Sequence, residues 1–156
     1  MDITIVTVGR KMPDWINHGV EEYTKRLSGE VRIKLVEIGA NKRGKSGGAN
    51  QCLLREAEKI RAALPAGNAY IALDEQGKQL STDSLSIKLK SWSNEGDSPY
   101  LVIGGADGLH DSIKTGAAEI WSLSRLTLPH ALARVLLVEQ IYRAWTILKG
   151  HPYHRS

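Results

Sequence analysis

Two short segments of the chain are apolar throughout, and they limit its fold more than any other feature. They are AYIAL at 69–73 and PYLVI at 99–103. A strand without a polar face has to be covered on both sides, as the central strands of a parallel sheet are. Strand-like and helix-like segments alternate about five times along the 156 residues. The sequence therefore predicts a single α/β domain spanning 1–156, with a mainly parallel sheet and helices on both of its faces.

The other expected elements follow from local periodicity. Alternating apolar residues predict strands over 2–8 and 31–38, and SLSRLTL at 122–128 also alternates like a strand. Apolar residues at helical spacing predict helices from Pro13 to about Leu27, over 53–64, after a cap at Ser81, from Asp111 or Ser112 through Ile120, and over 131–148. No linker separates these elements into two domains.

Charge and cysteine content restrict the partners and the compartment. The formal net charge of +4 favours an anionic partner, nucleic acid first. Cys52 is the only cysteine, so no internal disulfide can form and a reducing cytoplasm is expected. No run of about 18 apolar residues is present, so no membrane span is expected. No metal site is expected either, because the histidines lack companions at ligand spacing.

Three of the strand-like segments lead into or through loops of unusual composition. These loops are LDEQG at 73–77, GGADG at 104–108 and SLSRLTLPH at 122–130. In an open α/β sheet, ligands bind beyond the carboxyl ends of the strands. Any one of these loops could be an ordinary turn, but three at one edge of a parallel sheet predict a ligand cleft.

A nucleotide-binding alternative arises from GANKRGKS at 39–46, which matches the phosphate-binding pattern GxxxxGKS. IALDE at 71–75 looks like the strand and acidic residues that hold magnesium in such proteins. In a true P-loop, however, a helix begins at the Lys-Ser end of the motif. Here Gly47-Gly48-Ala49-Asn50 follows and delays the helix. The loop is better interpreted as a flexible basic arm for RNA phosphates or as a solvated loop.

Several motifs along the whole chain carry a family resemblance. They are KMPDW at 11–15, KRGK at 42–45, LVIGGADGL at 101–109, SLSRLTLPH at 122–130, VEQIYRAW at 138–145 and HPYHR at 151–155. With these motifs the chain resembles the ribosomal RNA large-subunit methyltransferase H family. These are small SPOUT-class enzymes that methylate N3 of a pseudouridine in bacterial 23S rRNA.

The resemblance implies a fold, a cofactor and an assembly. The fold would contain a trefoil knot, with the last helix passed through a loop. S-adenosylmethionine would be the methyl donor, no metal would be needed, and the enzyme would act as a homodimer. The cofactor contacts implied are Leu73, Gly104, Gly105, Leu123, Ser124, Arg125, Leu126, Thr127 and Leu128.

Methyl transfer to an imide nitrogen also needs help in removing the proton and stabilising the resulting anion. The candidates are His130 and the tail residues Tyr153, His154 and Arg155. Each could instead be structural, His130 by packing at the start of the helix and the tail as a terminus.

Contacts with 23S rRNA in the ribosome, in the region of helix 69, are expected from cationic side chains. They are Arg10, Lys11, Lys42, Arg43 and Lys45. Arg134 and Arg143 could join them or could pair within the helices. A non-catalytic RNA-binding protein would keep this basic surface but would need no cofactor cleft, so the three loops favour the enzyme.

Overall fold

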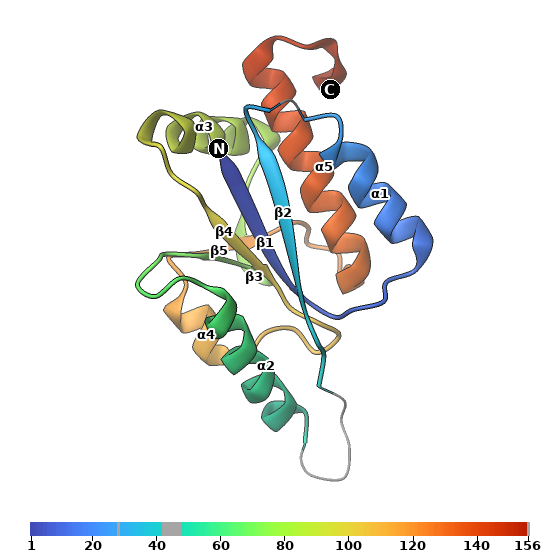
Figure 1. Ribbon diagram of the computed structural model, residues 1–156, viewed down its shortest axis with the longest axis vertical. Helices are drawn as coiled ribbons and strands as arrows, with labels where there is room; N and C mark the ends of the chain where they lie inside the picture. Colours follow the sequence, from blue (N-terminus) through green and yellow to red (C-terminus); the bar gives the residue numbers. More distant parts are fainter. Residues whose placement is uncertain (28, 42–47, 156) are drawn as a thin grey trace.

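Five parallel strands form one sheet in the order β2-β1-β4-β3-β5 (Figure 1). The computed structural model describes residues 1–27, 29–41 and 48–155. The strands are β1 (Asp2–Val8), β2 (Arg32–Ile38), β3 (Ile71–Gln79), β4 (Tyr100–Ile103) and β5 (Glu119–Ser122). The predicted parallel sheet is confirmed, and the two fully apolar segments form its interior strands β3 and β4.

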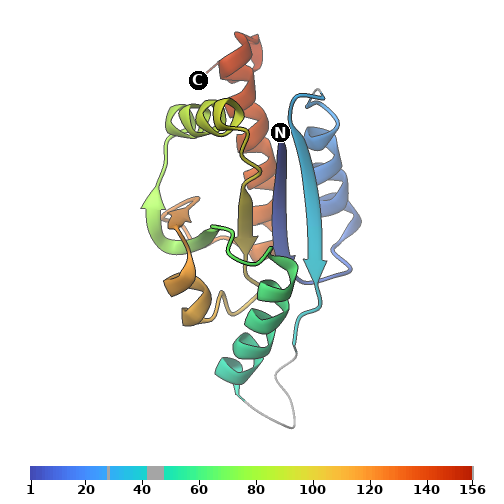
Figure 2. The same cartoon turned by 60° about the vertical axis from the view of Figure 1, so that its left-hand side comes forward.

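Helices cover both faces of this sheet, as predicted (Figure 1 and Figure 2). They are α1 (Asp14–Thr24), α2 (Ala49–Ala63), α3 (Thr82–Glu95), α4 (Asp111–Gly116) and α5 (His130–Lys149), followed by the 3-10 turn η1 (Pro152–His154). α1, α3 and α5 pack on the face that carries Ile5 and Leu101. α2 and α4 pack on the face that carries Val6 and Val102. Strand residues alternate between two apolar cores, which is why the interior strands have no polar face.

The last helix α5 extends from the carboxyl edge of the sheet to the opposite end of the molecule (Figure 1). Pro129 precedes its first residue, and Gly150 ends it with φ +66°, a conformation that suits glycine. Its 20 residues correspond to about 30 Å. His130 and the tail after Gly150 therefore lie at opposite ends of the helix.

Two predicted elements differ from the structure around β5. The helix expected through Ile120 ends at Gly116, and its cap is His110, whose Nδ1 accepts from the Ser112 backbone N–H. Glu119–Ser122 then forms β5, which pairs with β3. The strand-like pattern at 122–128 is a loop beyond Ser122. β4 is equally short but was predictable because it is apolar throughout, whereas Glu119–Ser122 neither alternates nor forms an apolar run, so only its pairing with β3 identifies it as a strand.

The ends of two other elements also differ from the predicted ones. The predicted strand 69–73 extends as β3 to Gln79, with an irregularity between Leu73 and Lys78. Gly77 lies in this extension, where an added Cβ would come within 2.7 Å of the Ile120 carbonyl oxygen. The expected cap at Ser81 is confirmed, because its side chain accepts from the Ser84 N–H. The first helix ends at Thr24, short of the expected Leu27.

Candidate functional site

A cleft of about 810 Å³ lies at the carboxyl end of β4, against the middle of β3 and beside the start of α5. Its lining comes from residues 73–76, 103–109, 122–124 and 126–130, together with Lys114 and Ala133. The fold thus gathers the three segments that the sequence marked as a ligand site, although the first of them, predicted as a loop at 73–77, is part of strand β3. Of the residues predicted to contact a cofactor, all but Arg125 line this cleft; Arg125 is exposed outside it.

The loop after β5 has its shape fixed by its own hydroxyl groups. Ser122 Oγ donates to the Ser124 carbonyl at 2.8 Å, and the Leu126 N–H donates to Ser124 Oγ at 2.9 Å. Thr127 Oγ1 donates to Glu75 Oε2 at 3.3 Å, which joins the loop to β3. Leu126 remains 76% exposed. An alternating sequence forms a loop here because the side chains of Ser122 and Ser124 satisfy the backbone locally.

The glycines after β4 close a tight turn. An added Cβ on Gly104 would collide with the Gly108 carbonyl, and one on Gly105 would lie 3.1 Å from Val8 Cγ1. The Gly108 N–H donates to the Gly105 carbonyl at 3.0 Å. The loop's own packing therefore explains why Gly104 has no side chain.

Charged groups in the cleft are mostly acidic. Asp74, Glu75 and Asp107 line it, and Lys114 is the basic residue among its lining. Lys114 Nζ lies 3.9 Å from Asp74 Oδ1, and Asp74 Oδ2 also accepts from the Gln76 N–H. Lys114 Nζ also lies 3.6 Å from Asp111 Oδ1, so this ammonium group is already paired and the lining as a whole suits a ligand that carries positive charge.

His130, the first residue of α5, lines the cleft as well. Its pKa is lowered, first by burial and second by the Arg134 guanidinium, while Glu56 acts in the opposite direction. A lowered pKa keeps the imidazole neutral at pH 7, which is the form that can accept a proton.

Arg134 is buried, with 1% of its side chain exposed. It pairs with Glu37 at 2.7 Å and donates to the Gly9 carbonyl at 2.8 Å. Arg143 pairs with Glu139 at 2.6 Å on its own helix. Of the two interpretations left open for these arginines, the structure shows pairing within the chain. No local pattern in the sequence distinguishes an arginine that contacts RNA from one that pairs within the chain.

The predicted catalytic residues of the tail lie far from the cleft within one chain. Tyr153 OH donates to Glu139 Oε1 at 3.1 Å, and its ring meets Tyr142 edge-on at 4.6 Å between centroids. The Arg143 guanidinium lies 5.0 Å from the Tyr153 ring centroid. Burial raises the pKa of the Tyr153 hydroxyl. His154 and Arg155 continue this end of α5, about 30 Å along the helix from His130.

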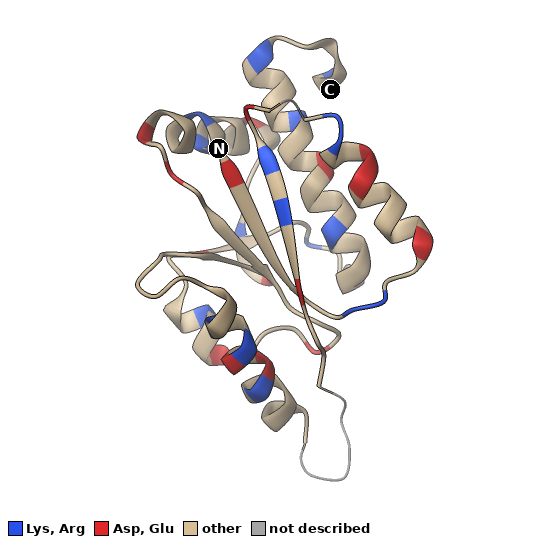
Figure 3. Cartoon of the chain, viewed as in Figure 1, with Lys and Arg blue, Asp and Glu red and all other residues tan. Residues whose placement is uncertain are grey.

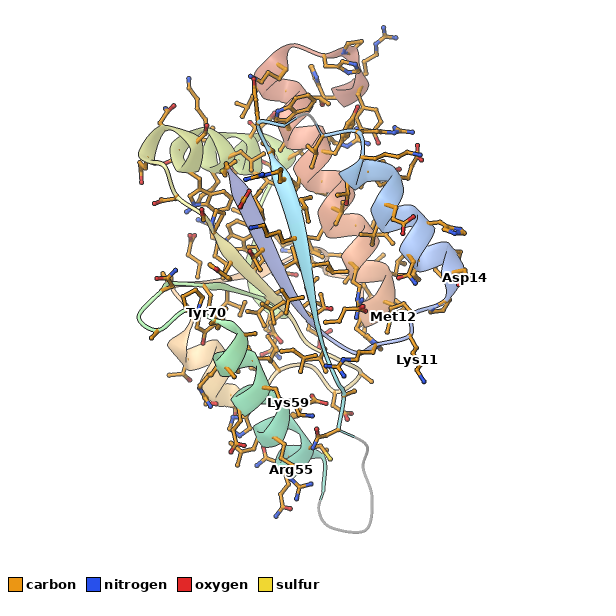
Figure 4. All side chains as sticks on the ribbon, in the orientation of Figure 1. Lys11, Met12, Asp14, Arg55, Lys59 and Tyr70 are labelled. Atoms are coloured by element: carbon orange, nitrogen blue, oxygen red, sulfur yellow. The ribbon has the colours of Figure 1, made fainter. Side chains whose placement is uncertain are left out.

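The predicted RNA contacts Arg10 and Lys11 follow β1, at the same edge of the sheet as the cleft, and both are exposed. Figure 3 shows basic residues in the connection between β1 and α1. Figure 4 shows the Lys11 side chain pointing into solvent. Lys11 has φ +57°, which is unusual for a residue other than glycine. Lys42, Arg43 and Lys45 lie outside the described residues.

Comparison with known proteins assigns the chain to a family. Residues 1–154 match the family described as predicted SPOUT methyltransferases. The chain belongs to the SPOUT methyltransferase family. It is 51% identical to the ribosomal RNA large subunit methyltransferase H of Polynucleobacter asymbioticus and 49% identical to that of Thiobacillus denitrificans, in both cases over all of either chain. The protein of the same name from Hydrogenovibrio crunogenus is 48% identical, again over the full length of both.

Membership of the SPOUT family and the strand order together contradict the P-loop alternative. In such a site the phosphate loop and the acidic strand hold one magnesium ion between them. Here the motif would follow β2 and the acidic residues lie in β3, with β1 and β4 between. Three strand spacings amount to about 14 Å. α2 begins only at Ala49, after Gly48, as the sequence indicated. A SPOUT methyltransferase is also an enzyme, which overturns the non-catalytic alternative.

The described part of the chain has neither a cluster of metal-ligand side chains nor a membrane-spanning helix. Within residues 1–27, 29–41 and 48–155, no three histidine, cysteine, aspartate or glutamate side chains come together in a way that could hold a metal ion. No helix of that part of the chain is long and apolar enough to cross a membrane.

Proposed function

We propose that this chain is an S-adenosylmethionine-dependent enzyme that methylates N3 of a pseudouridine in 23S rRNA, in the region of helix 69. The full-length relatives are named as methyltransferases of large-subunit ribosomal RNA. The observation that carries the proposal is the large cleft formed by residues 73–76 of β3 and by the segments 103–109, 122–124 and 126–130. We expect the enzyme in the cytoplasm with the ribosome, folded as one domain with a trefoil knot.

The residues of the cleft fit a sulfonium methyl donor. Its volume lies within the range of about 300–1,000 Å³ typical of small-ligand sites. Leu73, Ile103 and Leu109 offer apolar contact for an adenine ring, and the backbone of Ser124–Leu128 offers donors and acceptors for its edge. The carboxylates of Asp74, Glu75 and Asp107 favour a cationic ligand electrostatically. When bound, the donor supplies an electrophilic methyl group.

We assign removal of the substrate's imide proton to the His130 side chain. It is the group in the cleft lining that ionises nearest to neutral pH, and its lowered pKa leaves it free to accept the imide proton. A base that is neutral and partly desolvated also loses little hydration when RNA covers the cleft. Lowering the pH below its pKa would protonate it and stop this role.

The tail can reach a cleft only if a second copy supplies it. Within one chain about 30 Å of helix separates His130 from Tyr153. We therefore infer a homodimer in which the Tyr153, His154 and Arg155 side chains of one subunit complete the cleft of the other. Their phenol, imidazole and guanidinium would stabilise the anionic base. A sedimentation run showing only monomer under active conditions would contradict this arrangement.

RNA would reach the cleft across the loop after β1. Arg10 and Lys11 are exposed beside the carboxyl ends of the strands, where they can bind phosphates. Lys42, Arg43 and Lys45 are proposed to extend this contact. Binding through such groups would weaken steeply with salt.

The test is transfer of labelled methyl groups from S-adenosylmethionine to ribosomes that lack the modification. Incorporation into 23S rRNA, located by nuclease digestion and mass spectrometry at N3 of a pseudouridine, is the expected result. Free 50S subunits and assembled 70S ribosomes should be compared in parallel. No incorporation into either particle, or a thermal shift with millimolar ATP but none with S-adenosylmethionine, would overturn the proposal.

A further inference from the structure

The junction where β1 and β2 end and α5 begins is built around one buried cation. Arg134 has 1% of its side chain exposed, yet it carries a full charge. Its Nη1 pairs with Glu37 Oε2 of β2 at 2.7 Å, and its Nη2 donates to the Gly9 carbonyl after β1 at 2.8 Å. One guanidinium thus joins three segments that are distant in sequence. A planar fork with two separate donors is the feature that makes this possible, and lysine lacks it.

The same junction also contains buried polar atoms that form no hydrogen bond. Among the described residues, Arg134 Nε and Thr7 Oγ1 are buried and have no hydrogen-bond partner. Thr7 and Glu37 are register partners on β1 and β2, so their side chains share the sheet face on which α5 packs. A buried charge with unsatisfied neighbours is less stabilising than an apolar residue of similar volume. A role in fixing geometry explains why an arginine stands here.

Gly9 is where this junction meets the cleft. An added Cβ on Gly9 would lie 3.6 Å from Arg134 Nη2 and 3.9 Å from His130 Nε2, so the ends of both side chains gather over this residue. His130 precedes Arg134 by one helical turn, on the same side of α5. Gly9 has φ +116°, and the loop that it opens contains Lys11 at φ +57°. The Gly9 carbonyl that Arg134 holds therefore anchors the loop of Arg10 and Lys11.

We propose that Arg134 is a positioning residue: by holding Gly9 and Glu37 together, it sets the His130 side chain and the Arg10–Lys11 loop in a fixed relation at the mouth of the cleft. His130 and the Arg10–Lys11 loop would then contact the same RNA substrate in a fixed relative position. This inference rests on the proposed function, because His130 and the loop have their roles only there.

The decisive variant is Arg134→Lys, which keeps the charge but cannot reach both partners. We expect its kcat for rRNA methylation to fall by roughly tenfold to a hundredfold, the scale of a small misplacement of reacting groups. The Kd for S-adenosylmethionine, measured by calorimetry, should change less than threefold, because Arg134 is not part of the cleft lining. Arg32→Lys is the matched control. Arg32 pairs with Asp2 at 2.8 Å at the other end of β2 and should tolerate lysine without loss.

A double-mutant cycle separates positioning from general stability. If Arg134 acts through His130, then Arg134→Lys should lower kcat less than twofold in a His130→Ala background. Equal losses in both backgrounds, wild-type kcat in Arg134→Lys, or full activity in His130→Ala would each overturn the inference. Should Arg134→Lys fail to fold, Glu37→Gln weakens the same junction and is put through the same cycle.

A readout without turnover distinguishes this inference from the proposed function. In nuclear magnetic resonance spectra, Arg134→Lys should shift the His130 imidazole and the Lys11 amide together, while Arg32→Lys leaves both in place. Arg134 and Glu56 are the charged groups that act on His130, so spectra are compared at one pH well above its pKa. Unchanged resonances would refute the positioning role. A wild-type protein that binds S-adenosylmethionine but never methylates rRNA would refute only the proposed function.

Discussion

The two ends of α5 each carry an arginine paired with a glutamate, but the two pairs do different things. Arg134 near the start joins a residue 97 positions away and is buried. Arg143 near the end joins Glu139 one turn earlier and keeps 27% of its side chain exposed. The first pair attaches the helix to the sheet beside the cleft. The second belongs to the helix itself and supports the Tyr153 ring. One end is fixed to the sheet by the fold, and the other supports the tail that we propose completes the cleft of a second subunit.

Removing the tail tests this contrast most strongly. Deleting residues 151–156 should lower rRNA methylation at least a hundredfold, because the partner's cleft would lose the groups that stabilise the anionic base. The fold and the Kd for S-adenosylmethionine should be preserved, since the tail lies about 30 Å from the cleft of its own chain. Methyl incorporation and calorimetry on the same preparation measure both. Activity retained after the deletion would remove the tail from the mechanism.

Replacing the glutamate of each ion pair compares how much the two pairs contribute to the free energy of unfolding. Glu37→Ala leaves the buried Arg134 cation without its carboxylate and should lower the free energy of unfolding by about 2–4 kcal/mol. Glu139→Ala removes a buried carboxylate, but Arg143 keeps 27% of its side chain exposed and can be hydrated, so the loss should be smaller, about 1–2 kcal/mol. Urea denaturation followed by circular dichroism gives both values. Equal losses at the two ends would contradict the distinction between a tertiary and a local pair.

The pH dependence of kcat tests the environment of His130. Burial and Arg134 lower its pKa, so the neutral form and the rate should persist below the usual histidine pKa of about 6.5. Replacing the cation by Arg134→Met removes one of the two lowering effects. The acidic limb of the profile should then move to higher pH, while Arg32→Lys should not move it, because Arg32 lies at the other end of β2. A shift in the opposite direction would show that another group controls the limb.

The smallest effect is expected at Arg125. It lies in the loop between two cleft-lining segments but outside the lining itself, and it is exposed. Arg125→Ala should therefore leave the Kd for S-adenosylmethionine within twofold, whereas Leu128→Ala should weaken binding by removing apolar contact. Calorimetry on both variants is sufficient. A large loss at Arg125 would mean that the loop closes differently around the donor.

Part of the site was predictable because its signals are local. Strand ends, glycine turns and the Ser124–Leu128 loop lie within short segments, and strands in a parallel sheet bring their carboxyl ends to one edge. The positions of Tyr153 and Arg134 were not predictable in this way. Whether an arginine near the chain's end faces RNA or Glu37 depends on contacts across 97 residues, which no local pattern contains.

The sequence by itself determined the parallel sheet, the cap at Ser81 and which three segments line the cleft, because apolar periodicity and turn residues act over a few neighbours. Only the tertiary structure decided that Glu119–Ser122 is a strand, that Arg134 is buried against β1 and β2, and that the tail lies a helix length away from His130. Those outcomes depend on which distant segments pack together. Pairing and burial energies of that kind arise only once the whole chain has folded.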